Sequence, residues 1–203
     1  MVMRSFDLKA TALPSLLTTR QVTARSKAQV GIRPNLERLM HSLAEMAAIG
    51  LQPDGSVCRR GFSTEDVAGR ALLARWMNEA GLQVRIDTAG NLIGRLQGLD
   101  PDRPALMTGS HLDTVPTGGR FDGVLGVLAG LEVCRSLQDN SIRLQHDLEL
   151  IAFADEESTM VGCKGMAGTA SCDPKAYATS NREPIEDNLA RIGGHWPSLA
   201  SAR

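Results

Sequence analysis

Two apolar stretches, joined through a glycine-rich loop and a helical segment, constrain the fold of this chain more than any other feature. The first stretch, PALMTGSH, ends at His111, and the second, LELIAFA, ends at Ala154. Neither alternates apolar and polar residues, which is typical of strands covered on both faces. The segment DGVLGVLAGLEVCRSLQ between them predicts a helix of small and branched residues. This order of elements predicts a right-handed βαβ unit with both strands parallel in one sheet.

The residues before this unit predict two helices and a hairpin. Asn35 can cap a helix whose apolar residues recur at the helical period and which stops at Gly50. Ser63 and Thr64 offer caps for a second helix that runs to Gly81. LQVRID alternates like a half-buried strand, and AGNLIGRLQG is its predicted hairpin partner. We therefore expect an α/β protein.

Composition excludes several classes of protein. A hydrophobic share of 42% and a charged share of 22% over 203 residues are close to globular norms. The net charge of -1 carries no basic footprint for nucleic acid. No apolar run approaches the roughly 18 residues that cross a bilayer, so we expect no membrane partner. Four cysteines without CxxC spacing predict reduced thiols and an intracellular protein.

Residues 1–33 are predicted to be a flexible N-terminal extension. The first 30 residues carry five basic side chains against the single acid Asp7, with many serines and threonines. This balance fits a loose extension on a cytoplasmic protein, and the alternative is an organellar targeting segment over residues 1–30.

Chemically active side chains follow both apolar strands. His111 closes the first strand, and Asp155, Glu156 and Glu157 follow the second. Because ligands of open α/β sheets bind beyond the carboxyl ends of the strands, these residues are expected to converge. A lone histidine at a strand end is more often structural than a metal ligand. The presence of Asp113 favours His111 as a metal ligand. Residues two apart in a strand face the same side, and a metal-bound imidazole usually donates to a carboxylate.

Asp122 and the acidic triplet admit a structural and a functional interpretation. Asp122 opens the predicted helix and could cap it, or its two oxygens could bridge two metal ions. The triplet Asp155, Glu156 and Glu157 could be a solvated strand end. Gathered at a buried edge, however, three carboxylates raise each other's pKa unless cations neutralise them. A two-metal centre would remove that penalty and leave one carboxylate to take a proton from a bound water.

The segments GSHLDTVPTGGRFDGVLG and FADEES resemble the co-catalytic metal amidohydrolases related to aminoacylase and the carboxypeptidase-type peptidases. The resemblance is closest to the branch of N-carbamoyl-L-amino acid hydrolase, β-ureidopropionase and allantoate amidohydrolase. The spacings of 11 residues from His111 to Asp122 and 35 from Asp122 to Glu157 match that branch. The similarity covers roughly Leu36 to Arg203.

This resemblance implies a role for each site residue. His111 would be a terminal ligand of one metal ion, Asp122 the bridging ligand and Glu157 a ligand of the other ion. Glu156 would be the general base, and Asp113 would orient His111. The implied cofactors are two divalent ions, zinc first and manganese as the alternative, and the implied substrates are N-carbamoyl or ureido acids such as allantoate. The implied fold is part of a three-layer zinc-peptidase-like catalytic domain with a largely parallel mixed sheet.

The chain also departs from the family pattern. It has no HIEQG motif, no dimerisation domain and no late histidine ligand, although full-length members are homodimers. Residues 34–203 are therefore expected to be the N-terminal portion of a truncated catalytic domain. His41, His146 and His195 are interpreted as structural or surface residues. The alternatives are a catalytically silent fragment, a metallopeptidase or aminoacylase of the same family, and a dinucleotide binder, which the loop TGGRFDG disfavours.

Overall fold

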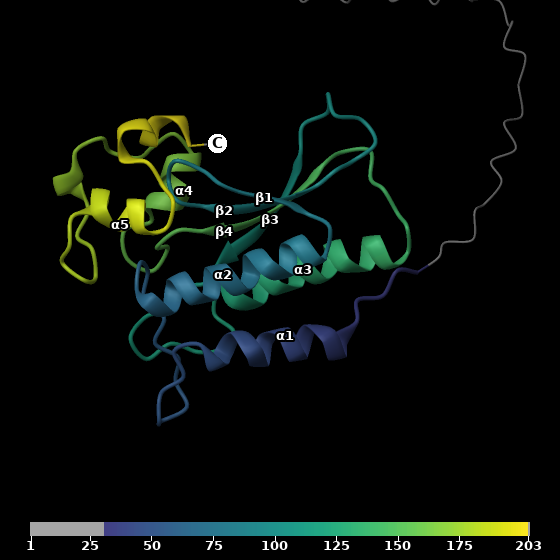
Figure 1. The fold of residues 1–203 in the computed structure, drawn as a ribbon, viewed down its shortest axis with the longest axis horizontal. Helices are drawn as coiled ribbons and strands as arrows, with labels where there is room; N and C mark the ends of the chain where they lie inside the picture. The colour runs from purple at the N-terminus through teal and green to yellow at the C-terminus, as the bar shows by residue number, and fades with distance from the viewer. Residues whose placement is uncertain (1–30, 203) are drawn as a thin grey trace, which may run out of the picture. The chain divides into compact units, whose positions relative to one another are not determined.

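The computed structural model describes residues 31–202, which fold around one mixed sheet of four strands (Figure 1). Residues 1–30 of the predicted N-terminal extension lie outside the described residues. The strands are β1 Gln83–Ile86, β2 Leu92–Leu96, β3 Leu106–His111 and β4 Leu148–Phe153. The α-helices are α1 Leu36–Ala48, α2 Thr64–Glu79, α3 Val124–Asp139, α4 Val161–Met166 and α5 Ile185–Arg191, with 3-10 helices η1 Pro174–Ala176 and η2 Trp196–Ser201.

The strand order is β1-β2-β4-β3, and only the last pair is parallel. β1 and β2 form the predicted antiparallel hairpin, and β2 pairs antiparallel with β4. β3 and β4 are parallel and are connected through α3, which confirms the predicted pairing of the two apolar strands. A mixed sheet was predicted correctly, but it is not largely parallel within residues 31–202.

The two apolar strands differ in burial, which corrects one expectation. β4 lies between β2 and β3 and is buried from Leu148 to Ala152. β3 is the last strand of the described sheet, and its residues Leu106 and Met107 are 46% and 55% exposed. A continuous apolar run therefore did not mean cover on both faces here, because β3 lies at the edge of a sheet on which α1 to α3 pack from one side only.

Three helices pack as the apolar patterns predict. α2 contacts β1 and β2, α3 contacts β3 and β4, and α1 packs against α3 (Figure 1). The predicted caps form, since the Asn35 side chain accepts from the backbone N–H of Arg38 and Ser63 from that of Asp66. In Figure 1, α1 to α3 lie on one side of the sheet. α4 and α5 instead contact η2 around a second apolar cluster that includes Phe62 and Ala154. Residues 31–202 thus show the sheet and one helix layer, α1 to α3, of the three-layer domain of which they were expected to form part.

A buried ion pair fastens α1 to α3. Glu132 of α3 is only 1% exposed, and its carboxylate accepts from the Arg38 guanidinium at 2.8 Å through two nitrogens. The same carboxylate accepts from the backbone N–H of Asn35 at 2.8 Å. Burial acts to raise the pKa of Glu132, but the hydrogen bonds from Arg38 and Asn35 outweigh it and hold the pKa below its ordinary value.

We predict that Glu132→Gln lowers the free energy of unfolding by about 1–3 kcal/mol at pH 7, since it weakens a buried charge-assisted pair. A carboxyl with a depressed pKa in the folded state stabilises the protein above its unfolded pKa, and that contribution is lost as the pH falls through the folded value. The difference between variant and wild type should therefore shrink below about pH 4. Urea unfolding at pH 7 and pH 3.5 measures it.

The matched control is Glu79→Gln, which breaks the exposed pair between Glu79 and Arg75 on α2. Exposed pairs contribute about 0–1 kcal/mol, so this variant should unfold almost like the wild type. Equal losses in the two variants would contradict a special role for Glu132.

Candidate metal centre

The parallel pairing of β3 and β4 brings their carboxyl ends to the same edge of the sheet. His111, the last residue of β3, is in register with Phe153, the last residue of β4. The chain after Phe153 continues within four residues to Glu156 and Glu157. The predicted convergence of His111 with the acidic segment is therefore confirmed.

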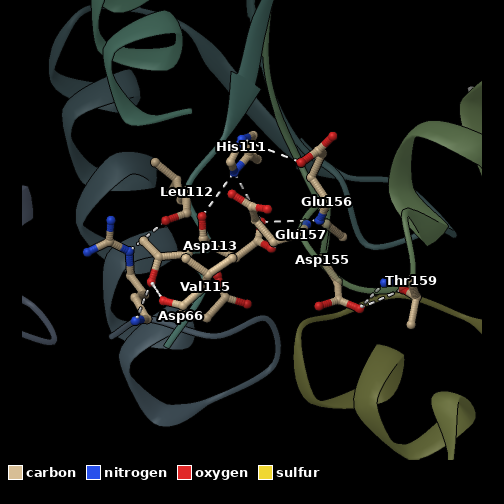
Figure 2. A network of polar contacts seen from close by, with 12 residues as sticks. Asp66, His111, Leu112, Asp113, Val115, Asp155, Glu156, Glu157 and Thr159 are labelled. Carbon is tan, nitrogen blue, oxygen red and sulfur yellow. Dashed lines mark hydrogen bonds and ion pairs between the residues drawn. The ribbon is translucent and has the colours of Figure 1, made fainter. Parts of the chain in front are cut away.

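His111, Glu156 and Glu157 form a cluster of side chains that could hold a metal ion. One ligand atom from each of the three lies within 4.8 Å of the others. The His111 Nε2 atom lies 3.5 Å from Glu156 Oε2 (Figure 2). The imidazole is 9% exposed while the Glu156 side chain is 35% exposed, so the cluster opens to solvent on the glutamate side.

The imidazole of His111 is held by the backbone of the loop that follows it. Its Nδ1 atom lies 2.9 Å from the carbonyl oxygen of Asp113 and 3.7 Å from the Asp113 carboxylate. A donor at Nδ1 fixes the tautomer in which Nε2 carries a lone pair. Asp113 thus orients His111 as expected, but through its main-chain oxygen rather than its side chain.

The Asp113 carboxylate instead joins the two strand ends. It accepts hydrogen bonds from the backbone N–H groups of Glu156 at 3.2 Å and Glu157 at 3.0 Å. Burial raises the pKa of Asp113 to about 6, although the bond from Glu157 acts to lower it. The buried Asp113 carboxylate, in the loop after β3, therefore fixes the backbone position of both glutamates after β4.

Asp155 does not join the cluster, although it belongs to the acidic triplet. Its carboxylate is buried and turns away from His111 to Thr159, as Figure 2 shows. Burial raises the pKa of this carboxyl group, against the hydrogen bonds that Thr159 donates. All three carboxylates follow β4 as expected, but only those of the two glutamates face the His111 imidazole.

Asp122 lies outside the group formed by His111, Glu156 and Glu157, and its side chain is exposed. The structural alternative for Asp122, a side-chain cap of α3, is not formed, because the cap position is Gly123, with φ of 65° and no side-chain cap bond. A Cβ built on Gly123 would lie 2.5 Å from the His111 ring. Glycine is thus required where the loop crosses the imidazole. Asp122 directly precedes this glycine in the sequence.

The other histidines take no part in the cluster, as predicted. His41 pairs with Glu45 on the exposed surface of α1, and His146 contacts the Pro104 carbonyl oxygen. His195 contacts the Ser198 hydroxyl at the start of η2. The four cysteines form no disulfide bond, also as predicted. No helix within residues 31–202 is long and apolar enough to cross a membrane.

A layer of buried charge lies below the cluster and was not found from the sequence. Asp66 lies in the first turn of α2, where it is buried and accepts from the backbone N–H of Phe62. Burial raises the pKa of Asp66, while Arg70 and Arg59 act to lower it. Thr159 was also missed, and its one available signal was its position four residues after Asp155, where an aspartate side chain can close a turn.

The donor set fits a divalent metal ion of the zinc or manganese type. One imidazole and two carboxylates are ligands that both ions accept. Two ligands of one zinc ion, each about 2.0–2.2 Å from it, lie at most about 4 Å apart, so the three groups need only small side-chain rotations to share an ion. The fixed tautomer of His111 also leaves the nitrogen that faces the glutamates free to coordinate.

Comparison with known proteins identifies relatives of this chain. The model of the family described as peptidase family M20/M25/M40 matches residues 107–193. The N-carbamoyl-L-amino acid amidohydrolase of Geobacillus stearothermophilus is 46% identical over 154 residues, which are 73% of this chain and 37% of that protein. A ureidoglycolate hydrolase of Arabidopsis thaliana is 34% identical over 73% of this chain and 31% of its own length.

Solved structures agree with these relatives. The hydantoinase/carbamoylase family amidase of Burkholderia ambifaria superimposes with a TM-score of 0.76 and 39% identity, over 81% of this chain and 42% of that one. This chain therefore spans between 31% and 42% of the length of the three relatives named. Together these matches identify the chain as a member of the peptidase family M20/M25/M40, homologous to the N-carbamoyl-L-amino acid amidohydrolases of its hydantoinase/carbamoylase branch.

Proposed function

We propose that this chain is part of a metal-dependent amidohydrolase. The enzyme would cleave a non-peptide carbon–nitrogen bond of an N-carbamoyl amino acid or of a ureido compound such as allantoate. The observation that carries this proposal is the cluster of His111, Glu156 and Glu157 at the carboxyl ends of two parallel strands. The names of the relatives support the substrate class, since they include an N-carbamoyl-L-amino acid amidohydrolase and a ureidoglycolate hydrolase. Residues 34–203 would form part of the catalytic domain.

His111, Asp122 and Glu157 would hold the metal ions, zinc first and manganese as the alternative. Bound divalent ions would activate water and offset the negative charge that develops on the substrate oxygen. Asp122 would reach the site by movement of the loop before Gly123, the residue that already contacts the His111 ring. Asp113 would keep the Nε2 atom of His111 directed at the site through its carbonyl oxygen.

Glu156 would be the general base. Its carboxylate lies 3.5 Å from His111 Nε2 and is partly exposed, so a water molecule and a substrate can both reach it. It would take the proton of the attacking water and deliver it to the leaving nitrogen. The cluster contains both glutamates, and the division between base and ligand rests on the family pattern.

A second candidate is a protein that binds metal without catalysing hydrolysis. One histidine and two glutamates form the cluster among residues 31–202, and Asp122 lies outside it. A two-ion centre usually needs more ligands than these.

We predict that the purified chain binds Zn²⁺ or Co²⁺ and that His111→Ala weakens this binding by at least about tenfold, since it removes the only imidazole of the cluster. Isothermal titration and the visible spectrum of bound Co²⁺ measure the effect. His195→Ala is the control, because His195 lies on an exposed loop and should not alter affinity. Equal affinities in wild type and His111→Ala would reject the assigned ligand.

We predict that Glu156→Gln lowers the rate of hydrolysis of an N-carbamoyl-L-amino acid by about 10²–10⁴-fold, because the amide cannot accept the proton. Zn²⁺ affinity should change far less. Ammonia release with Zn²⁺ or Mn²⁺ present measures the rate, and an N-acetyl amino acid and a dipeptide test the aminoacylase and peptidase alternatives.

The wild type decides between the two candidate functions. Bound metal without turnover of any of these substrates would favour the second candidate. Turnover that persists unchanged in Glu156→Gln would reject this residue as the base.

A further inference from the structure

The chain that follows β4 makes a closed turn around the two glutamates. Asp155 has φ of 49° and Met160 has φ of 56°, both in the left-handed region that few residues other than glycine adopt. The carbonyl oxygen of Asp155 accepts from the backbone N–H of Met160 at 2.8 Å and closes the turn. Glu156 and Glu157 lie inside this closed segment.

The side chain of Asp155 fastens the turn from within. One carboxylate oxygen, Oδ2, accepts from the backbone N–H of Thr159 at 3.1 Å and from its hydroxyl group at 2.6 Å. Asp155 is 2% exposed and Thr159 is also buried, so water does not compete for these bonds. The Lys164 ammonium group, which lies outside the turn in sequence, donates to the carbonyl oxygen of Thr159 at 3.0 Å and further stabilises the turn.

The glutamates are therefore held from two directions. From the β3 side, the Asp113 carboxylate accepts from their two backbone N–H groups. From the other side, the bonds between Asp155 and Thr159 close the turn that contains them (Figure 2). Because both side chains project from this short segment, a change in the turn changes their distance to His111.

A glycine before α2 leaves room for this arrangement. A Cβ built on Gly61 would lie 2.0 Å from Asp155 Oδ1 and 2.7 Å from its Cγ, far inside contact distance. The loop before α2 thus packs directly on the Asp155 carboxyl group. Any side chain at position 61 would displace Asp155 or the loop itself.

We infer that Asp155 is a positioning residue, which acts with Thr159 and the space left by Gly61 to direct Glu156 and Glu157 at His111. The inference rests on the proposed function only for what the two glutamates do. The turn itself is a property of the described fold, so it can be tested without turnover.

The test compares Asp155→Ala, Asp155→Asn and Gly61→Ala in the full 203-residue chain. Asp155→Ala removes the acceptor for Thr159, and Gly61→Ala displaces an intact Asp155. Both should weaken Co²⁺ binding by about 10–100-fold, the usual effect of losing a residue that orients ligands. Asp155→Asn keeps a carbonyl oxygen for Thr159 and should restore most of the affinity.

Amide hydrogen exchange of Glu156 and Glu157 is the second readout and needs no metal. It should accelerate in Asp155→Ala and Gly61→Ala but not in Asp155→Asn, because only the first two loosen the turn. Thr159→Val and Thr159→Ser form a milder pair should Asp155→Ala fail to fold. Serine keeps the hydroxyl donor and should behave like the wild type, whereas valine should not.

Asp173→Ala is the matched control. Asp173 also closes a local turn, by accepting from the backbone N–H of Lys175, but it lies on the exposed surface at η1. It should leave both readouts unchanged. Wild-type exchange rates and Co²⁺ affinity in Asp155→Ala and Gly61→Ala would overturn the inference. A different result would separate the two proposals. If the wild type binds no metal, but amide exchange at Glu156 and Glu157 is faster in Asp155→Ala and Gly61→Ala than in the wild type, the proposed function is rejected and the inference stands.

Discussion

The parallel pairing of β3 with β4 is the constraint on which the site depends. Its register places His111 beside Phe153, so the chain leaving β3 and the chain leaving β4 start from adjacent points. A slip of one residue would turn His111 to the opposite face of the sheet, since side chains alternate along a strand. α3 packs on both strands and connects them, which couples this register to the main core. The site is therefore positioned by the sheet, and its loops only refine it.

Backbone groups carry much of that refinement. The Asp113 carbonyl oxygen orients the His111 ring, and the Asp113 carboxylate accepts from the amides of Glu156 and Glu157. One residue thus relates an imidazole on the first strand end to two carboxylates on the second. These bonds use Nδ1 of His111 and the backbone N–H groups of Glu156 and Glu157, so they leave His111 Nε2 and the two glutamate carboxylates available to a metal ion.

The sequence predicted the elements and the convergence of the site, because both depend on local pattern and on general rules for parallel strands. It identified His111, Glu156 and Glu157 as neighbours, and it predicted Asn35 and Ser63 as caps that the structure confirms. The exposure of β3 could not be predicted, since an apolar run does not state how many neighbours a strand has. The turn at Asp155 was missed for another reason. A left-handed φ at a non-glycine residue leaves no periodic trace, and here it accompanies a local bond to Thr159 and a tertiary contact with Gly61.

Two buried carboxylates hold the segment that carries Glu156 and Glu157. Burial raises the pKa of Asp66, Asp113 and Asp155, and Arg70 and Arg59 oppose this rise at Asp66. Asp113 accepts from the amides of the two glutamates, and Asp155 accepts from the backbone N–H and hydroxyl groups of Thr159. Because both acceptors are buried, water does not compete for these bonds. The position of the two glutamates therefore depends on both carboxylates, one in the loop after β3 and one in the turn after β4.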